Sequence, residues 1–132
     1  MKKVLAILGV ACIVFSVCAC SSSAPVPTSK ASSKAVSIGK QAFDIIDQYL
    51  DGTETYRTVS DTLYDLHDRM RYASEYSYPY TDEQRADYDI QRYILFASTY
   101  IHIDHNGGTP ENYEKIISYR NKIAGLVGED AR

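Results

Sequence analysis

The chain has 132 residues, enough for one small domain, and its aromatic residues are twelve Tyr and three Phe with no Trp. Its 14 Lys and Arg against 17 Asp and Glu give a formal net charge of −3. Lys2 and Lys3 are the only charges before residue 20, so the rest of the chain is more acidic still. An acidic domain gains nothing from a phosphate backbone, and we therefore expect no nucleic-acid partner.

The first residues have the pattern of an export signal. Met1-Lys2-Lys3 is a short positive segment, and residues 4–17 are almost entirely apolar. This stretch is shorter than the roughly 20 apolar residues that a membrane-spanning helix needs. Serines and prolines follow it, in place of a basic flank that would stop transfer.

The segment Val17-Cys18-Ala19-Cys20 resembles the lipobox of bacterial lipoproteins: an aliphatic residue, a small residue, Ala or Gly, and then Cys. The resemblance covers residues 1–20 only, and Cys18 departs from the usual Ser, Thr or Ala. It implies that residues 1–19 are a signal peptide and that Cys20 carries a diacylglyceryl lipid. The mature chain would then be anchored, on its extracytoplasmic side, to the cell membrane or outer membrane. The alternatives are an ordinary secretory signal and an uncleaved anchor.

The remaining sequence divides into a tether, a domain and a tail. Residues 20–35 contain the lipidated Cys20 and a flexible linker rich in Ser, Pro and Ala. We expect a helical domain over residues 36–128 and a disordered tail over residues 129–132. No Cys follows residue 20, so a disulfide framework and a Cys metal site are excluded. We expect no cofactor besides the covalent lipid.

Two helices are expected in the first half of the domain. Apolar residues at helical spacing predict a helix over residues 36–50, which Gly52 terminates. A second helix is predicted over residues 54–76, with Thr53 as its N-cap. Its apolar residues follow a heptad seam: Tyr56, Val59, Leu63, Leu66, Met70 and Ala73.

Two further helices are expected after the break at Pro79. Thr81 and Gln84 form a capping box that starts a helix reaching His105. Around Leu95 and Phe96 this helix is apolar on most sides, so we expect it to be the most buried helix. We interpret its acidic residues, including Asp87 and Asp89, as a solvated face. Thr109-Pro110 starts the fourth helix, and Gly128 ends it.

The fold expected from this order is all-α, a small up-down-up-down four-helix bundle, because short connections make sequential helices antiparallel neighbours. The alternative is a three-helix bundle with a loosely docked first helix.

Antiparallel folding would gather polar residues at one end of the bundle. His102 and His105 share a helix face, and Asp104 and Glu111 lie nearby, so these four residues are a candidate metal site. The alternative is that they are polar residues at helix ends, where His is favourable near a C-terminus. His67 does not belong to this group, because it is expected to lie opposite Arg92.

The opposite end is rich in Tyr. Tyr72, Tyr76, Tyr78 and Tyr80, with Tyr88 beside them, are a candidate contact patch for an envelope protein or a cell-wall partner. The alternative is that the rings cap the core.

No catalytic constellation is present, so the sequence favours a non-enzymatic, lipid-anchored binding module. A metal- or small-ligand-binding lipoprotein using His102 and His105 is the alternative function.

Overall fold

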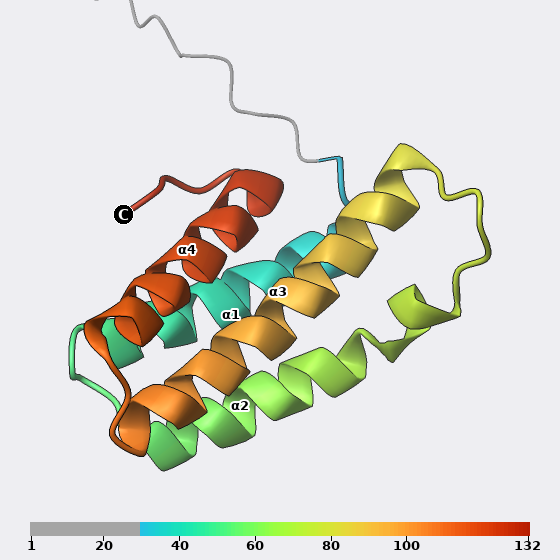
Figure 1. Ribbon diagram of the computed structural model, residues 1–132. Coiled ribbons are helices and arrows are strands. Elements are labelled where there is room, and N and C mark those ends of the chain that lie inside the picture. Colours follow the sequence, from blue (N-terminus) through green and yellow to red (C-terminus); the bar gives the residue numbers. More distant parts are fainter. Residues whose placement is uncertain (1–29) are drawn as a thin grey trace, which may run out of the picture.

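The computed structural model describes residues 30–132 as an all-α four-helix bundle with no strand in that range (Figure 1). The helices are α1 (Ser33–Leu50), α2 (Tyr56–Arg69), α3 (Asp82–His105) and α4 (Pro110–Val127), and a 3-10 helix, η1 (Arg71–Glu75), follows α2. Consecutive helices run in opposite directions, which confirms the predicted bundle. The expected signal peptide and Cys20 lie outside the described residues.

The core is filled from all four helices, so α1 is an integral part of the bundle. Ile38 and Ile46 of α1 lie with Ile90 and Ile94 of α3 in one buried cluster. Of the predicted seam, Val59, Leu63 and Leu66 are buried in α2, and Met70 and Ala73 are buried just beyond its end. Tyr56 is only half-buried. The three-helix alternative is therefore wrong.

Close packing of α1 on α4 depends on a glycine. A Cβ built on Gly39 would lie 2.6 Å from Cγ1 of Val127, which is inside van der Waals contact. The missing side chain lets the two helices approach at this point.

Local end signals set most helix boundaries. The Thr81 side chain accepts from the backbone N–H of Gln84, and the Gln84 side chain accepts from the Thr81 N–H, so the predicted capping box is formed. Gly52 (φ +69°) and Gly128 (φ +81°) take the left-handed conformation expected after α1 and α4.

Two helix starts differ from the prediction. α1 begins at Ser33 because Ser32 caps it, so the linker is shorter than expected and Ala35 is buried in the core. α2 begins at Tyr56 with Thr55 as its N-cap. Thr53 is not the cap, because its hydroxyl donates to the carbonyl of Gln48 in the preceding turn.

The structure also differs at the end of α2 and in the middle of α3. α2 ends at Arg69, and its expected last turns form η1 instead. Leu95 is 37 % exposed, so α3 is not buried on most sides there.

The last residues fold back on the bundle, whereas we expected a disordered tail. The Glu129 carboxylate lies 2.5 Å from the Lys40 ammonium, and the Arg132 guanidinium donates to Asp47. Polar partners at both ends of the tail therefore hold it against α1.

None of the helices within residues 30–132 is long and apolar enough to cross a membrane.

Candidate functional site

A buried carboxylate organises the entry end of the bundle, by which we mean residues 30–36, η1, the start of α3 and the end of α4. Asp87 of α3 is 0 % exposed, and the interpretation of Asp87 as part of a solvated face is therefore wrong. Its carboxylate accepts from the Ser32 N–H (2.8 Å), the Ser32 hydroxyl (2.7 Å) and the Tyr76 hydroxyl (3.1 Å). Asp87 thus joins α3 to the start of α1 and to the segment after η1.

The expected tyrosine patch divides into two parts, of which Tyr72 and Tyr76 form the inner one. Their rings meet edge to face with centroids 6.0 Å apart, and the Lys34 ammonium lies 4.1 Å from the Tyr72 ring. Burial, together with the charge and hydrogen bond of Asp87, raises the pKa of Tyr76 to about 12. The Tyr72 ring packs against the hydrophobic core, and Tyr76 lies half-buried beside it.

Tyr78 and Tyr80 form the outer part. Tyr78 is 83 % exposed, and its ring meets Tyr80 edge to face at 6.1 Å. Tyr80 in turn stacks on Tyr88 of α3 at 5.9 Å. We call these three residues the tyrosine ladder, and they form a continuous aromatic surface at the entry end.

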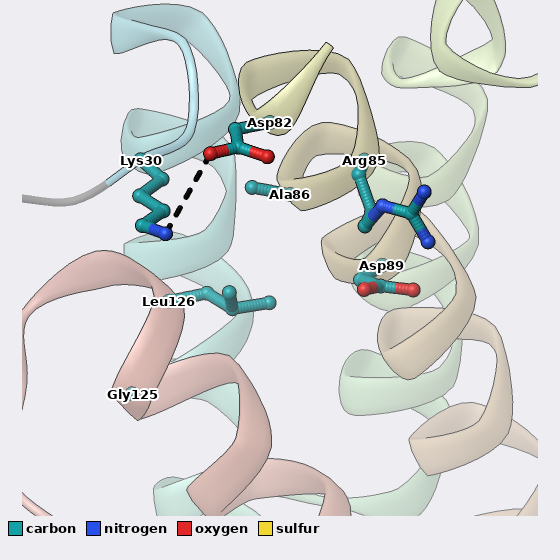
Figure 2. Close-up of a pocket in the computed structure, with 7 residues that line it drawn as sticks. All are labelled: Lys30, Asp82, Arg85, Ala86, Asp89, Gly125 and Leu126. Carbon is teal, nitrogen blue, oxygen red and sulfur yellow. Dashed lines mark ion pairs between the residues drawn. The ribbon is translucent and has the colours of Figure 1, made fainter. Parts of the chain in front are cut away.

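Two pockets flank α3 at this end. The first, of about 330 Å³, lies between the start of α3 and the end of α4, where Ala86, Gly125 and Leu126 line it (Figure 2). The Lys30 ammonium reaches Asp82 at 3.7 Å across this pocket, while Arg85 points away from Lys30. Both side chains of this ion pair are largely exposed, so the pair contributes little to stability.

The second pocket lies on the other side of α3, facing α2 and η1. It has a volume of about 250 Å³, and its lining includes His67, Tyr88 and Arg92. His67 therefore lies near Arg92, as the sequence predicted, and away from the other two histidines.

The candidate metal residues do not form a ligand set. The Tyr56 hydroxyl lies 2.5 Å from Nδ1 of His102, and the Tyr56 ring stacks on His105 at 4.0 Å with an interplanar angle of 4°. Asp104 accepts from the Tyr49 hydroxyl at 2.5 Å. A hydrogen bond with the Thr109 side chain lowers the pKa of Glu111, which is exposed at the start of α4.

Within residues 30–132, no three His, Cys, Asp or Glu side chains come together as a metal site. Tyr56, which the sequence placed only in the core seam of α2, is instead the residue that engages both histidines at this far end. Burial and the hydrogen bond to Asp104 raise the pKa of Tyr49 as well. The far end is therefore a set of polar helix-end contacts.

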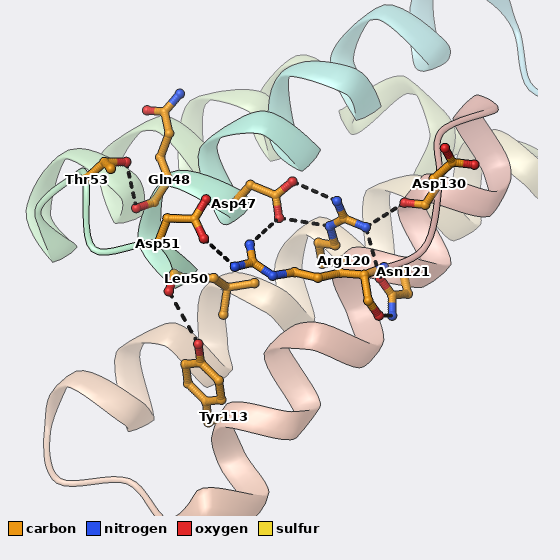
Figure 3. A network of polar contacts seen from close by, with 10 residues as sticks. Asp47, Gln48, Leu50, Asp51, Thr53, Tyr113, Arg120, Asn121 and Asp130 are labelled. Atoms are coloured by element: carbon orange, nitrogen blue, oxygen red, sulfur yellow. Dashed lines mark hydrogen bonds and ion pairs between the residues drawn. The ribbon is translucent and has the colours of Figure 1, made fainter.

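A salt-bridge network crosses from α1 to α4 (Figure 3). Arg120 is 6 % exposed, and its Nε and Nη2 donate to the two oxygens of Asp47 at 3.0 and 2.7 Å. Its Nη1 donates to the Asp130 carbonyl, and its guanidinium lies 3.9 Å from the Phe43 ring. Arg132 adds hydrogen bonds to Asp47 and Asp51. These contacts hold the C-terminal residues against the bundle and stabilise the fold.

No protein family, curated protein or solved structure matches this chain.

Proposed function

We propose that the chain is a lipid-anchored lipoprotein of the cell envelope, a non-enzymatic module that binds its partner through the tyrosine ladder. The proposed anchoring is supported by the segment Val17-Cys18-Ala19-Cys20, which follows an apolar stretch. Lipid chains that bury in a bilayer contribute about 0.8 kcal/mol per CH₂, and two such chains hold a protein stably at a membrane.

The position of the ladder supports the binding role. Residues 21–31 separate Cys20 from the capping residue Ser32, and even fully extended they reach only about 40 Å. An anchored chain would therefore keep the entry end, which contains Tyr78 and Tyr80, close to the membrane surface. A partner embedded in the envelope or in the cell wall would meet this end first.

The chemistry of the ladder suits a contact surface. Exposed Tyr rings offer a large area with a polar hydroxyl at little cost in side-chain entropy, and Tyr is enriched at interfaces for this reason. Tyr78 is the most exposed of the large hydrophobic side chains among residues 30–132. Its ring contacts Tyr80 edge to face, and Tyr80 in turn stacks on Tyr88.

Labelling of cells with radioactive palmitate tests the anchoring. We expect the wild type and Cys18→Ala to become labelled, whereas Cys20→Ala stays unlabelled and is released from the membrane fraction. Because Cys18→Ala removes the neighbouring thiol only, it controls for a general effect on export. Labelling of Cys20→Ala would refute the anchoring.

Cross-linking in intact cells followed by affinity capture tests the ladder. The double variant Tyr78→Ala/Tyr80→Ala should lose its captured partners. Tyr64→Ala should keep them, because Tyr64 is 60 % exposed on α2 but lies outside the ladder. If the double variant and Tyr64→Ala capture the same partners as the wild type, the ladder is not the contact surface.

A further inference from the structure

The second pocket is lined mainly by hydrogen-bond donors and by the ring of Tyr88, and none of its lining residues carries a carboxylate. It lies between the end of α2, η1 and α3 and has a volume of about 250 Å³. The lining residues are His67, Arg71, Ser74, Tyr88, Gln91, Arg92 and Leu95. Two guanidinium groups and a side-chain amide therefore surround one small space.

Gln91 is the residue that points to a ligand. It is 4 % exposed and lines the pocket, and none of the hydrogen bonds among residues 30–132 involves its side-chain amide. The amide is not one of the fully buried unpaired polar atoms of that range, so it opens onto the pocket, where solvent can reach it. A polar group bound in the pocket would take the place of this solvent as the partner of the amide.

The two arginines are available to the same occupant. The Arg71 guanidinium has no ion-pair partner within the described part of the chain. Arg92 is held with its guanidinium 5.6 Å from the rings of both Tyr88 and Phe96. Rings that fix a guanidinium in this way reduce the entropy it loses on binding.

Two carboxylates outside the pocket oppose this positive charge. Asp89 lies 3.6 Å from Arg92, and Asp68 lies 4.0 Å from Nδ1 of His67. The Asp68 side chain is 72 % exposed and that of Asp89 is 29 % exposed, and neither lines the pocket. The unpaired Arg71 and the amide of Gln91 keep the pocket donor-rich.

We propose that this pocket binds the oxyanion group, phosphate or carboxylate, of a small ring-bearing molecule. Arg71 and Arg92 present N–H donors whose planar geometry matches such oxyanions, and Gln91 adds an amide donor at the buried side. The ring of the ligand lies against Tyr88. Since Tyr88 is also the base of the tyrosine ladder, the occupied pocket would extend that surface. The proposal does not depend on the lipid anchor.

Isothermal titration calorimetry of the full chain in nonionic detergent tests the proposal, with phenyl phosphate, benzoate and inorganic phosphate as probes and benzyl alcohol as the neutral control. We expect saturable binding of both ring-bearing anions, weaker binding of inorganic phosphate, and no binding of benzyl alcohol. Arg71→Gln and Arg92→Gln should each lower the affinity for phenyl phosphate by about tenfold or more, as the loss of a charge-assisted hydrogen bond does. Gln91→Leu, which removes the amide but keeps the bulk, should also lower it.

Arg57→Gln is the matched control, because it removes one exposed positive charge from α2 far from the pocket. Its affinity should equal that of the wild type, and circular dichroism should show that all the variants stay helical. Saturable binding in Cys20→Ala would keep the proposal intact even if the anchoring failed. Absence of heat with all three anions would overturn the proposal, and so would equal affinity in Arg71→Gln, Arg92→Gln and Arg57→Gln.

Discussion

The carboxylate of Asp87 accepts two hydrogen bonds from Ser32, one from its backbone N–H at 2.8 Å and one from its hydroxyl at 2.7 Å. The same hydroxyl accepts from the Ala35 N–H and thereby caps α1. One buried carboxylate therefore fixes the point at which the chain enters the bundle. In an anchored protein, any pull from the membrane would act first on this junction.

Replacement of Asp87 should destabilise the bundle. Asp87→Ala leaves the N–H of Ser32 and the hydroxyl of Tyr76 without their buried acceptor, and we expect the free energy of unfolding to fall by about 3 kcal/mol. Urea denaturation followed by circular dichroism measures this. Asp61→Ala, which removes an exposed carboxylate from α2, should change the free energy very little. Equal effects of the two replacements would contradict the role of Asp87.

Two neighbouring tyrosines should respond differently to the loss of their hydroxyls. Tyr76→Phe removes a hydrogen bond to Asp87 and should cost about 1 kcal/mol of unfolding free energy. The buried hydroxyl of Tyr72 has no partner among residues 30–132, so Tyr72→Phe should be at least as stable as the wild type. Thermal unfolding of the two variants side by side measures the difference. A lower stability for Tyr72→Phe than for Tyr76→Phe would show that the Tyr72 hydroxyl is paired.

The two arginines that bind Asp47 should also differ. Arg120→Met leaves a partly buried Asp47 with only the solvated Arg132, and we expect a loss of about 3 kcal/mol because Arg120 itself is buried. Arg132→Met should have a much smaller effect, since water screens the exposed pair. Chemical denaturation of both variants tests this order, and a larger effect at Arg132 would reverse our assignment of the network.

Asp47 should make the free energy of unfolding depend on pH in the acidic range. Burial raises the pKa of Asp47, but hydrogen bonds from Arg120 and Arg132 outweigh it and hold that pKa below its ordinary value of 3.8. The charged form is therefore favoured in the folded state, and its stabilising effect is present above pH 3.8 and lost as the pH falls through the lowered value. The difference in unfolding free energy between wild type and Asp47→Asn should shrink over that range. A difference that increases as the pH falls would contradict this prediction.

Signals that act over a few residues could be read from the sequence. The capping box of Thr81 and Gln84, the glycines that end α1 and α4, and the heptad seam of α2 each depend on neighbours within a turn or two. These signals were sufficient to predict the number of α-helices and their order along the chain. The starts of α1 and α2 were predicted less accurately, since α1 begins at Ser33 where residue 36 was expected, and α2 begins at Tyr56 where residue 54 was expected.

The polar interior of α3 was the main feature that the sequence interpretation missed. Asp87 lies three residues before Ile90 and seven before Ile94, and Gln91 lies three residues before Ile94, so a signal for their burial was present in the spacing. The partners of Asp87, however, are Ser32 and Tyr76, which no local pattern could place beside it. The same holds for Tyr56, whose contact with two histidines joins α2 to the end of α3.

Intact-protein mass spectrometry of the membrane fraction tests the proposed attachment through Cys20 most directly. We expect a mature chain that begins at Cys20 and carries the added mass of a diacylglyceryl group. A chain that retains Met1, or one that begins at another residue and has no lipid, would contradict it.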